Sequence, residues 1–266
     1  MSGPQVQFLD VGSETATRRI AYLTQAGHPG EPGILWLAGL KSDMVSTKAE
    51  ALSHFAADRG LSYTRFDYSG HGQSEGMFEN GTIGDWLEEA LAVFSGLTTG
   101  GQIVVGSSTG GHIALLMLRH LVTKDAREAA RLRGLVLIAP AWDLTEELMW
   151  KAFPETARQE MMEQGYTLRP SDYGEPYRIT KRFIEEGRAH LLARKPFNPG
   201  RPISILQGLQ DKDVPAAHTR ELTTFIEGDW IKLVEVPDGE HRLSRPQDLD
   251  RLYALIIEQI DRVKQE

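Results

Sequence analysis

Residues 101–122, GQIVVGSSTGGHIALLMLRHLV, place an apolar run, a glycine-rich turn and a long apolar helical pattern in direct succession. The apolar run predicts a buried strand, and the pattern after the turn predicts a helix. Gly106 and Gly110 stand two residues either side of Ser108, so the pattern G-x-S-x-G centres on Ser108 and not on Ser107. Such glycines let strand and helix approach closely and hold the central serine in a strained, exposed conformation. The stretch therefore predicts an α/β fold with Ser108 as candidate nucleophile.

The alternation of strand and helix extends on both sides of this turn. Strands are expected at residues 33–39, 62–68, 101–107, 133–140, 202–208 and 230–237. Helices are expected at residues 47–59, 82–97, 109–123, 216–226 and 246–263. Strands that alternate with helices pair in parallel through right-handed crossovers. Two half-polar runs, residues 5–11 and 18–24, suit an antiparallel pair at the sheet edge. We therefore expect about eight strands, mostly parallel, with helices on both faces.

The alternation is interrupted between residues 141 and 200, where the sequence pattern becomes helical and rich in Met and Trp. We expect a small helical cap there, inserted into a core made of residues 1–140 and 201–266. Because the insertion leaves the carboxyl end of a strand beside the turn, it should lie over Ser108. Large apolar side chains that could line a pocket under it are Trp142, Leu148, Met149, Trp150, Phe153, Met161 and Met162. Stripes at helical spacing are more often packing, so none is assigned to substrate.

A serine hydroxyl needs a base, and the base needs a third group that fixes its tautomer. His241 follows the strand at 230–237 and is the only histidine in a loop just beyond a late strand. Asp211 and Asp213 follow the strand at 202–208, so serine, acid and histidine come in the order of a nucleophile-elbow hydrolase. We favour Asp211, which comes first, and expect Asp213 to cap the next helix. Asp238 is a third option, with turn formation as its alternative role.

Acyl transfer also needs two N–H donors for the oxyanion of the tetrahedral intermediate. One is expected from Thr109, the residue after the candidate nucleophile, at the positive end of the following helix. The other is expected from Leu40, in the loop that follows the strand at 33–39, where Gly39 permits a sharp turn. An alternative explanation of Gly39 and Leu40 is an ordinary tight turn at the end of the strand.

The tracts WLAGLKSDM, RFDYSGHGQSEG, VVGSSTGG, LQGLQDKDVP and GEHRLS together resemble the α/β-hydrolase superfamily along essentially the whole chain. The similarity is greatest to the group that contains the mitochondrial palmitoyl-protein thioesterase, also a mycophenolic acid acyl-glucuronide esterase, with its bacterial relatives. The resemblance implies Ser108 as nucleophile, Asp211 as acid, His241 as base, and the amides of Leu40 and Thr109 as the oxyanion hole. One departure is Ala38, which stands where the wider superfamily has histidine before glycine.

The resemblance implies a serine esterase or thioesterase acting on a small-molecule or acylated substrate. A carbon–carbon bond hydrolase or a perhydrolase of the same fold is the alternative reaction. A ligand-binding module without activity is a further alternative, which the presence of both serine and histidine disfavours.

Composition excludes several other classes. The chain has 266 residues, no cysteine and a net charge of −8. Without cysteine there is no disulfide, thiolate metal site or cysteine nucleophile. The sequence has no cluster of basic residues interleaved with aromatic residues, so nucleic acid is not an expected partner. SGHGQSEG resembles a dinucleotide-binding loop, but its third glycine would fall on Glu75. We expect no cofactor and no metal.

The first residues lack the pattern of a signal peptide, and no run approaches the ~18 apolar residues of a membrane span. We expect a soluble bacterial cytoplasmic protein of undetermined oligomeric state.

Overall fold

The computed structural model describes residues 5–170 and 175–265. Eight strands form one sheet in the order β1-β2-β4-β3-β5-β6-β9-β10. Their bounds are Gln7–Ser13 (β1), Ala16–Gln25 (β2), Gly33–Leu37 (β3), Tyr63–Phe66 (β4), Gln102–Ser107 (β5), Leu132–Ile138 (β6), Ile203–Gly208 (β9) and Ile231–Val236 (β10). Strand β2 runs antiparallel to β1 and β4, and the other neighbours are parallel. The predicted eight-stranded, mostly parallel sheet is confirmed.

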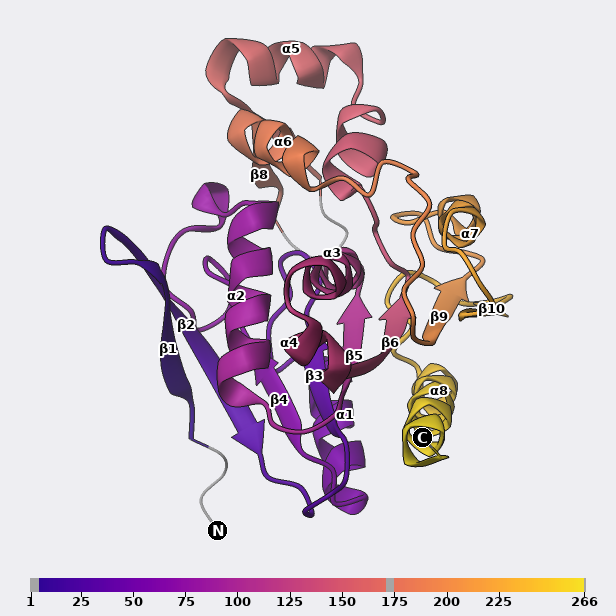
Figure 1. Cartoon of the computed structure of the whole chain (residues 1–266). Helices are drawn as coiled ribbons and strands as arrows, with labels where there is room; N and C mark the ends of the chain where they lie inside the picture. Colours follow the sequence, from indigo (N-terminus) through magenta and orange to yellow (C-terminus); the bar gives the residue numbers. More distant parts are fainter. Residues whose placement is uncertain (1–4, 171–174, 266) are drawn as a thin grey trace.

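Helices cover both faces of the sheet, which explains why β3, β5 and β9 are buried along their whole length (Figure 1). Their bounds are Thr47–Asp58 (α1), Ile83–Leu97 (α2), Thr109–Lys124 (α3), Ala126–Arg131 (α4), Ala216–Thr224 (α7) and Pro246–Gln265 (α8). Helices α1 and α8 pack together through Phe55 and Tyr253, whose rings stack at 4.6 Å. Helix α4 was not expected; its N-cap is Asp125, whose carboxylate accepts from the amides of Arg127 and Glu128.

The segment between β6 and β9 leaves and re-enters neighbouring strands of the sheet. It contains a π-helical turn, Thr145–Trp150, helices α5 (Glu155–Gln164) and α6 (Lys181–Gly187), and a 3₁₀ turn, Arg188–His190. Figure 1 shows α5 and α6 beyond the carboxyl ends of β5 and β6. Within the described residues, no helix combines the length and apolar character that crossing a membrane requires.

The expectation of a purely helical insertion is wrong in one respect. Strands β7 (Tyr166–Arg169) and β8 (Tyr177–Thr180) form an antiparallel two-stranded sheet. Gly165, at φ +84°, ends α5 and frees the chain to become extended. At the other end the Thr180 hydroxyl accepts from the Phe183 amide at 3.1 Å, so α6 begins only after Thr180.

Candidate active site

Ser108 lies at the abrupt turn between β5 and α3. Its backbone has φ 55° and ψ −116°, a conformation that costs a residue with a side chain on the order of 1–3 kcal/mol. Hydrogen bonds hold it there: the Ser108 amide donates to the Ile138 carbonyl at 2.8 Å, and its carbonyl accepts from the amides of Gly111 at 2.9 Å and Ala141 at 3.0 Å. The strained turn expected from the sequence is therefore present, and it is fixed by β6 and by the first turn of α3.

The two flanking glycines are required by contact between backbones. A Cβ on Gly106 would lie 2.4 Å from the carbonyl oxygen of Gly110. A Cβ on Gly110 would lie 2.1 Å from the carbonyl oxygen of Leu37 in β3. Neither neighbour is a flexible side chain, so only glycine lets α3 leave the sheet at this angle.

Ser108, His241 and Asp211 form a continuous chain of hydrogen bonds. His241 Nε2 lies 3.2 Å from Ser108 Oγ, and His241 Nδ1 lies 2.8 Å from Asp211 Oδ2. An ionised carboxylate can only accept, so Nδ1 carries the ring proton and Nε2 is free to accept the serine proton. The Asp211 side chain is fully buried and that of His241 is 18% exposed. The arrangement can therefore draw a proton from Ser108 toward His241.

Leu40 and Thr109 line the same cavity as Ser108 and His241. Among the described residues, neither backbone amide has a protein acceptor. Gly39 brings the Leu40 loop close, because a Cβ there would lie 3.3 Å from Ser108 Cβ. Asp67 stabilises this loop: its Oδ1 accepts a hydrogen bond from the Met44 amide at 2.6 Å. Two donors are thus available beside the serine hydroxyl, as an oxyanion hole requires.

The cavity at this point has a volume of about 440 Å³. Its apolar wall is formed by Leu40, Ala141, Leu144, Val214 and Tyr177, and its charged lining by Lys41, Arg169, Glu175 and Asp213. None of the seven large apolar side chains that the sequence offered for a pocket is among the described lining residues. Trp142 and Met149 are fully buried in the core, and Trp142 stacks on His218 at 4.3 Å. The described wall is therefore more polar than the composition of the insertion suggested.

The alpha/beta hydrolase family matches residues 30–254. The chain belongs to the alpha/beta hydrolase family.

Relatives of this hydrolase include the mitochondrial palmitoyl-protein thioesterase ABHD10 of Homo sapiens, 31% identical over 87% of this chain and 74% of the relative. A solved structure of a putative hydrolase from Agrobacterium vitis is 41% identical, with a TM-score of 0.93 over 97% of this chain and 100% of that one. Mouse alpha/beta hydrolase domain-containing protein 10 is 29% identical, with a TM-score of 0.83 over 97% of this chain and 99% of that one. These comparisons confirm the resemblance seen in the sequence, including the thioesterase group.

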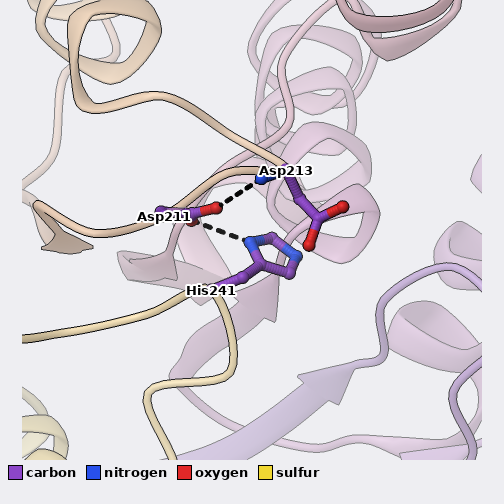
Figure 2. Close-up of side chains that lie close together, drawn as sticks. All are labelled: Asp211, Asp213 and His241. Atoms are coloured by element: carbon purple, nitrogen blue, oxygen red, sulfur yellow. Dashed lines mark hydrogen bonds and ion pairs between the residues drawn. The ribbon is translucent and has the colours of Figure 1, made fainter. Parts of the chain in front are cut away.

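The alternatives to Asp211 have other partners in this hydrolase. The Asp213 carboxylate lies 3.8 Å from the Arg169 guanidinium and does not cap α7, which begins after Pro215, so that expectation was wrong. The Asp238 carboxylate pairs with Arg245 at 2.8 Å. Figure 2 shows Asp211 bonded to the His241 ring, with Asp213 on the other side of the ring.

Asp211, Asp213 and His241 also form a cluster whose possible ligand atoms lie within 4.8 Å of one another. Both oxygens of Asp211 already accept protein hydrogen bonds: Oδ1 from the amides of Asp213 at 2.9 Å and Val214 at 2.8 Å, and Oδ2 from His241. These donors account for a buried carboxylate without a cation. The expectation of no metal stays a prediction.

Gln207 was missed by sequence analysis. It is fully buried on β9, and its amide nitrogen lies 3.4 Å from Asp211 Oδ2 and donates to the Val214 carbonyl at 3.0 Å. The Thr219 hydroxyl donates to its amide oxygen at 2.6 Å. Gln207 thus ties the acid loop to α7 and orients the buried carboxylate. A long polar side chain inside a mostly apolar strand was the available signal.

Proposed function

We propose that this hydrolase is a serine hydrolase of carboxylic esters or thioesters that works through an acyl-enzyme on Ser108. The observation that carries the proposal is the hydrogen-bonded series Ser108–His241–Asp211, whose serine is held in a strained turn. Residues 141–200 are proposed to act as a cap over a core of residues 1–140 and 201–266. The cytoplasmic location expected from the sequence stays a prediction.

The reaction follows from the positions of these groups. Ser108 Oγ attacks the carbonyl carbon of the substrate, and its proton passes to His241 Nε2. The Asp211 carboxylate stabilises the resulting imidazolium, while the amides of Leu40 and Thr109 donate to the oxyanion. His241 then returns the proton to the leaving oxygen or sulfur, which departs and leaves the acyl-enzyme. Water, whose proton passes to His241 Nε2, attacks the carbonyl carbon of this ester; the bond from that carbon to Ser108 Oγ then breaks, His241 returns the proton to Oγ, and the acid is released.

The proposed subclass is an acyl-thioesterase or an acyl-glucuronide esterase. It is supported by relatives that are named palmitoyl-protein thioesterases and are 29–32% identical to this chain. A carbon–carbon bond hydrolase or a perhydrolase stays the alternative. The apolar wall next to Ser108 suits an acyl group, but no contact in the described residues selects a chain length.

The test is the rate of hydrolysis for matched oxygen esters and thioesters from acetyl to palmitoyl. The variants Ser108→Ala and Ser107→Ala are measured in parallel, because the neighbouring serine is a control for disturbance of the turn. We expect Ser108→Ala to lose at least ~10³-fold in kcat and Ser107→Ala to stay within ~10-fold. Wild-type rates with Ser108→Ala would overturn the proposal.

A further inference from the structure

A second cleft of about 200 Å³ also opens onto Ser108 and His241. It runs from the end of β3, past the start of α1, to the loop that follows His241. Its described lining contains the basic residues Lys41, Lys48 and Arg242 and no Asp or Glu, although the chain as a whole carries a charge of −8. The Lys41 ammonium lies 4.7 Å above the Phe78 ring. We call this region the basic cleft.

Lys48 is the most informative residue of the basic cleft. Its ammonium donates to the Arg242 carbonyl at 2.5 Å and to the Ser244 hydroxyl at 3.3 Å, both uncharged acceptors. Among the described residues, no carboxylate lies within ion-pair distance of it. Burial and the nearby Arg242 charge together lower the pKa of Lys48 to about 8, although the more distant Asp248 carboxylate acts in the opposite direction. A cation so placed would be stabilised by an anion in the cleft.

The start of α1 adds hydrogen-bond donors to the same cleft. Ser46 is the N-cap residue, but its side chain caps no amide of the first turn, and its buried hydroxyl has no partner. The amides of the first turn have no intrahelical acceptor, and the helix dipole makes this end positive. Trp36, which lines the cleft, is 1% exposed and its indole N–H has no acceptor. The acidic residue of the first turn, Glu50, pairs with Arg65 at 2.7 Å and is not among the lining residues.

We propose that the basic cleft binds an oxyanion, a carboxylate or a phosphate, carried by the leaving group of the substrate. This rests on the proposed function, because the cleft matters to catalysis only if Ser108 is the nucleophile. Donors without acceptors, a half-buried ammonium and a helix N-terminus together match an oxyanion in charge and in hydrogen bonding. We assign the anion to the leaving group and not to the acyl group, because the larger cavity has the apolar wall that suits an acyl group. His241, which protonates the leaving atom, borders both spaces.

Two pairs of substrates test this proposal. Thioesters of one acid with N-acetylcysteine and with N-acetylcysteamine differ by a carboxylate. Glycol monoesters of that acid with and without a terminal phosphate differ by a phosphate. The measured quantity is the ratio of kcat/KM for the anionic member to that for the neutral member, so general damage to the enzyme cancels. The neutral members, compared with Ser108→Ala, report on the proposed function independently of the cleft.

Lys48→Gln, Lys48→Arg and a control, Lys124→Gln, are compared with the wild type. Lys124 ends α3, about 20 Å along that helix from Thr109, is exposed, and its replacement changes the net charge equally. We expect the wild type and Lys124→Gln to prefer the anionic member of at least one pair by about tenfold. Lys48→Gln should lose that preference, and Lys48→Arg should keep most of it.

Inorganic phosphate provides an independent readout. It should inhibit hydrolysis of the neutral esters competitively in the wild type and about tenfold more weakly in Lys48→Gln. Preference in only one pair identifies the anion as carboxylate or phosphate and supports the proposal. Equal ratios for Lys48→Gln and Lys124→Gln, or a wild-type preference for the neutral member of both pairs, would overturn it.

Discussion

Replacing Asp211 by asparagine should stop proton transfer while leaving the shape of the site intact. Asp211 Oδ1 accepts from the amides of Asp213 and Val214, so this position must remain an oxygen in Asp211→Asn. The new NH₂ group then takes the place of Oδ2, 2.8 Å from His241 Nδ1. Because that group donates, Nδ1 must become the acceptor and Nε2 must carry the ring proton. Nε2 can then no longer accept the proton of Ser108.

The size of the effect follows from the charge that is lost. A carboxylate and an imidazolium with charge centres about 4 Å apart attract by about 4 kcal/mol at an effective dielectric constant near 20. That energy corresponds to about 10³-fold in rate, and the wrong tautomer adds to the loss. We expect kcat to fall about 10³- to 10⁴-fold.

The assay is the steady-state hydrolysis of one activated ester, with far-UV circular dichroism as a check of folding. Asp213→Asn is the matched control, since it removes a carboxylate from the same loop. Its side chain is 41% exposed and lies 3.8 Å from Arg169, but it also lines the cavity beside His241, so we expect a loss of less than about tenfold, well below that of Asp211→Asn. The reasoning would be refuted if Asp213→Asn lost more activity than Asp211→Asn.

Three further predictions concern stability and the support of the site. Gly110→Ala should lower the free energy of unfolding by about 3 kcal/mol and abolish activity because of its backbone clash, whereas Gly96→Ala, which has open space in α2, should raise it by about 0.5–1 kcal/mol; urea denaturation measures both. Gln207→Leu should lower kcat about tenfold and the free energy of unfolding by about 1–3 kcal/mol, because it leaves the Thr219 hydroxyl without its acceptor; an unchanged kcat would mean that Gln207 does not orient Asp211. Hydrogen bonds from Arg194 lower the pKa of Glu147 to about 2, so this contribution to stability is present at neutral pH and is lost as pH falls from about 4.5 towards 2. Glu147→Gln should therefore be less stable than the wild type by about 1–2 kcal/mol at neutral pH, and the difference should vanish near the acid end of a denaturation series.

The sheet and its helices could be predicted because local sequence determines them. Buried parallel strands are short continuous apolar runs, and in residues 101–122 the strand, turn and helix follow one another without interruption. The order Ser108, Asp211, His241 could be predicted because each residue follows a strand, and parallel strands end at the same edge of the sheet. The structure brings these three side chains within hydrogen-bond distance.

The surroundings of the triad could not be predicted in the same way. The two-stranded sheet of β7 and β8 depends on a left-handed Gly165 and on the N-cap of α6 at Thr180, two single-residue signals in a stretch whose sequence pattern is otherwise helical. The lining of the two cavities depends on which loop side chains converge in space, and sequence spacing carries no such information. Trp142 illustrates the point: it was a candidate for the pocket, but it is fully buried and stacks on His218.

The central claim is that the reaction passes through an ester on Ser108. In the most direct test, the enzyme reacts with an activated acetyl ester and the reaction is stopped with acid during the first turnover. The modified peptide is then identified by mass spectrometry. The account predicts one acetyl group per chain, on Ser108, that disappears in Ser108→Ala and decays at the rate of turnover in the wild type. Turnover with no acetyl group on Ser108 would contradict it. So would an acetyl group on another residue together with full activity of the Ser108→Ala variant.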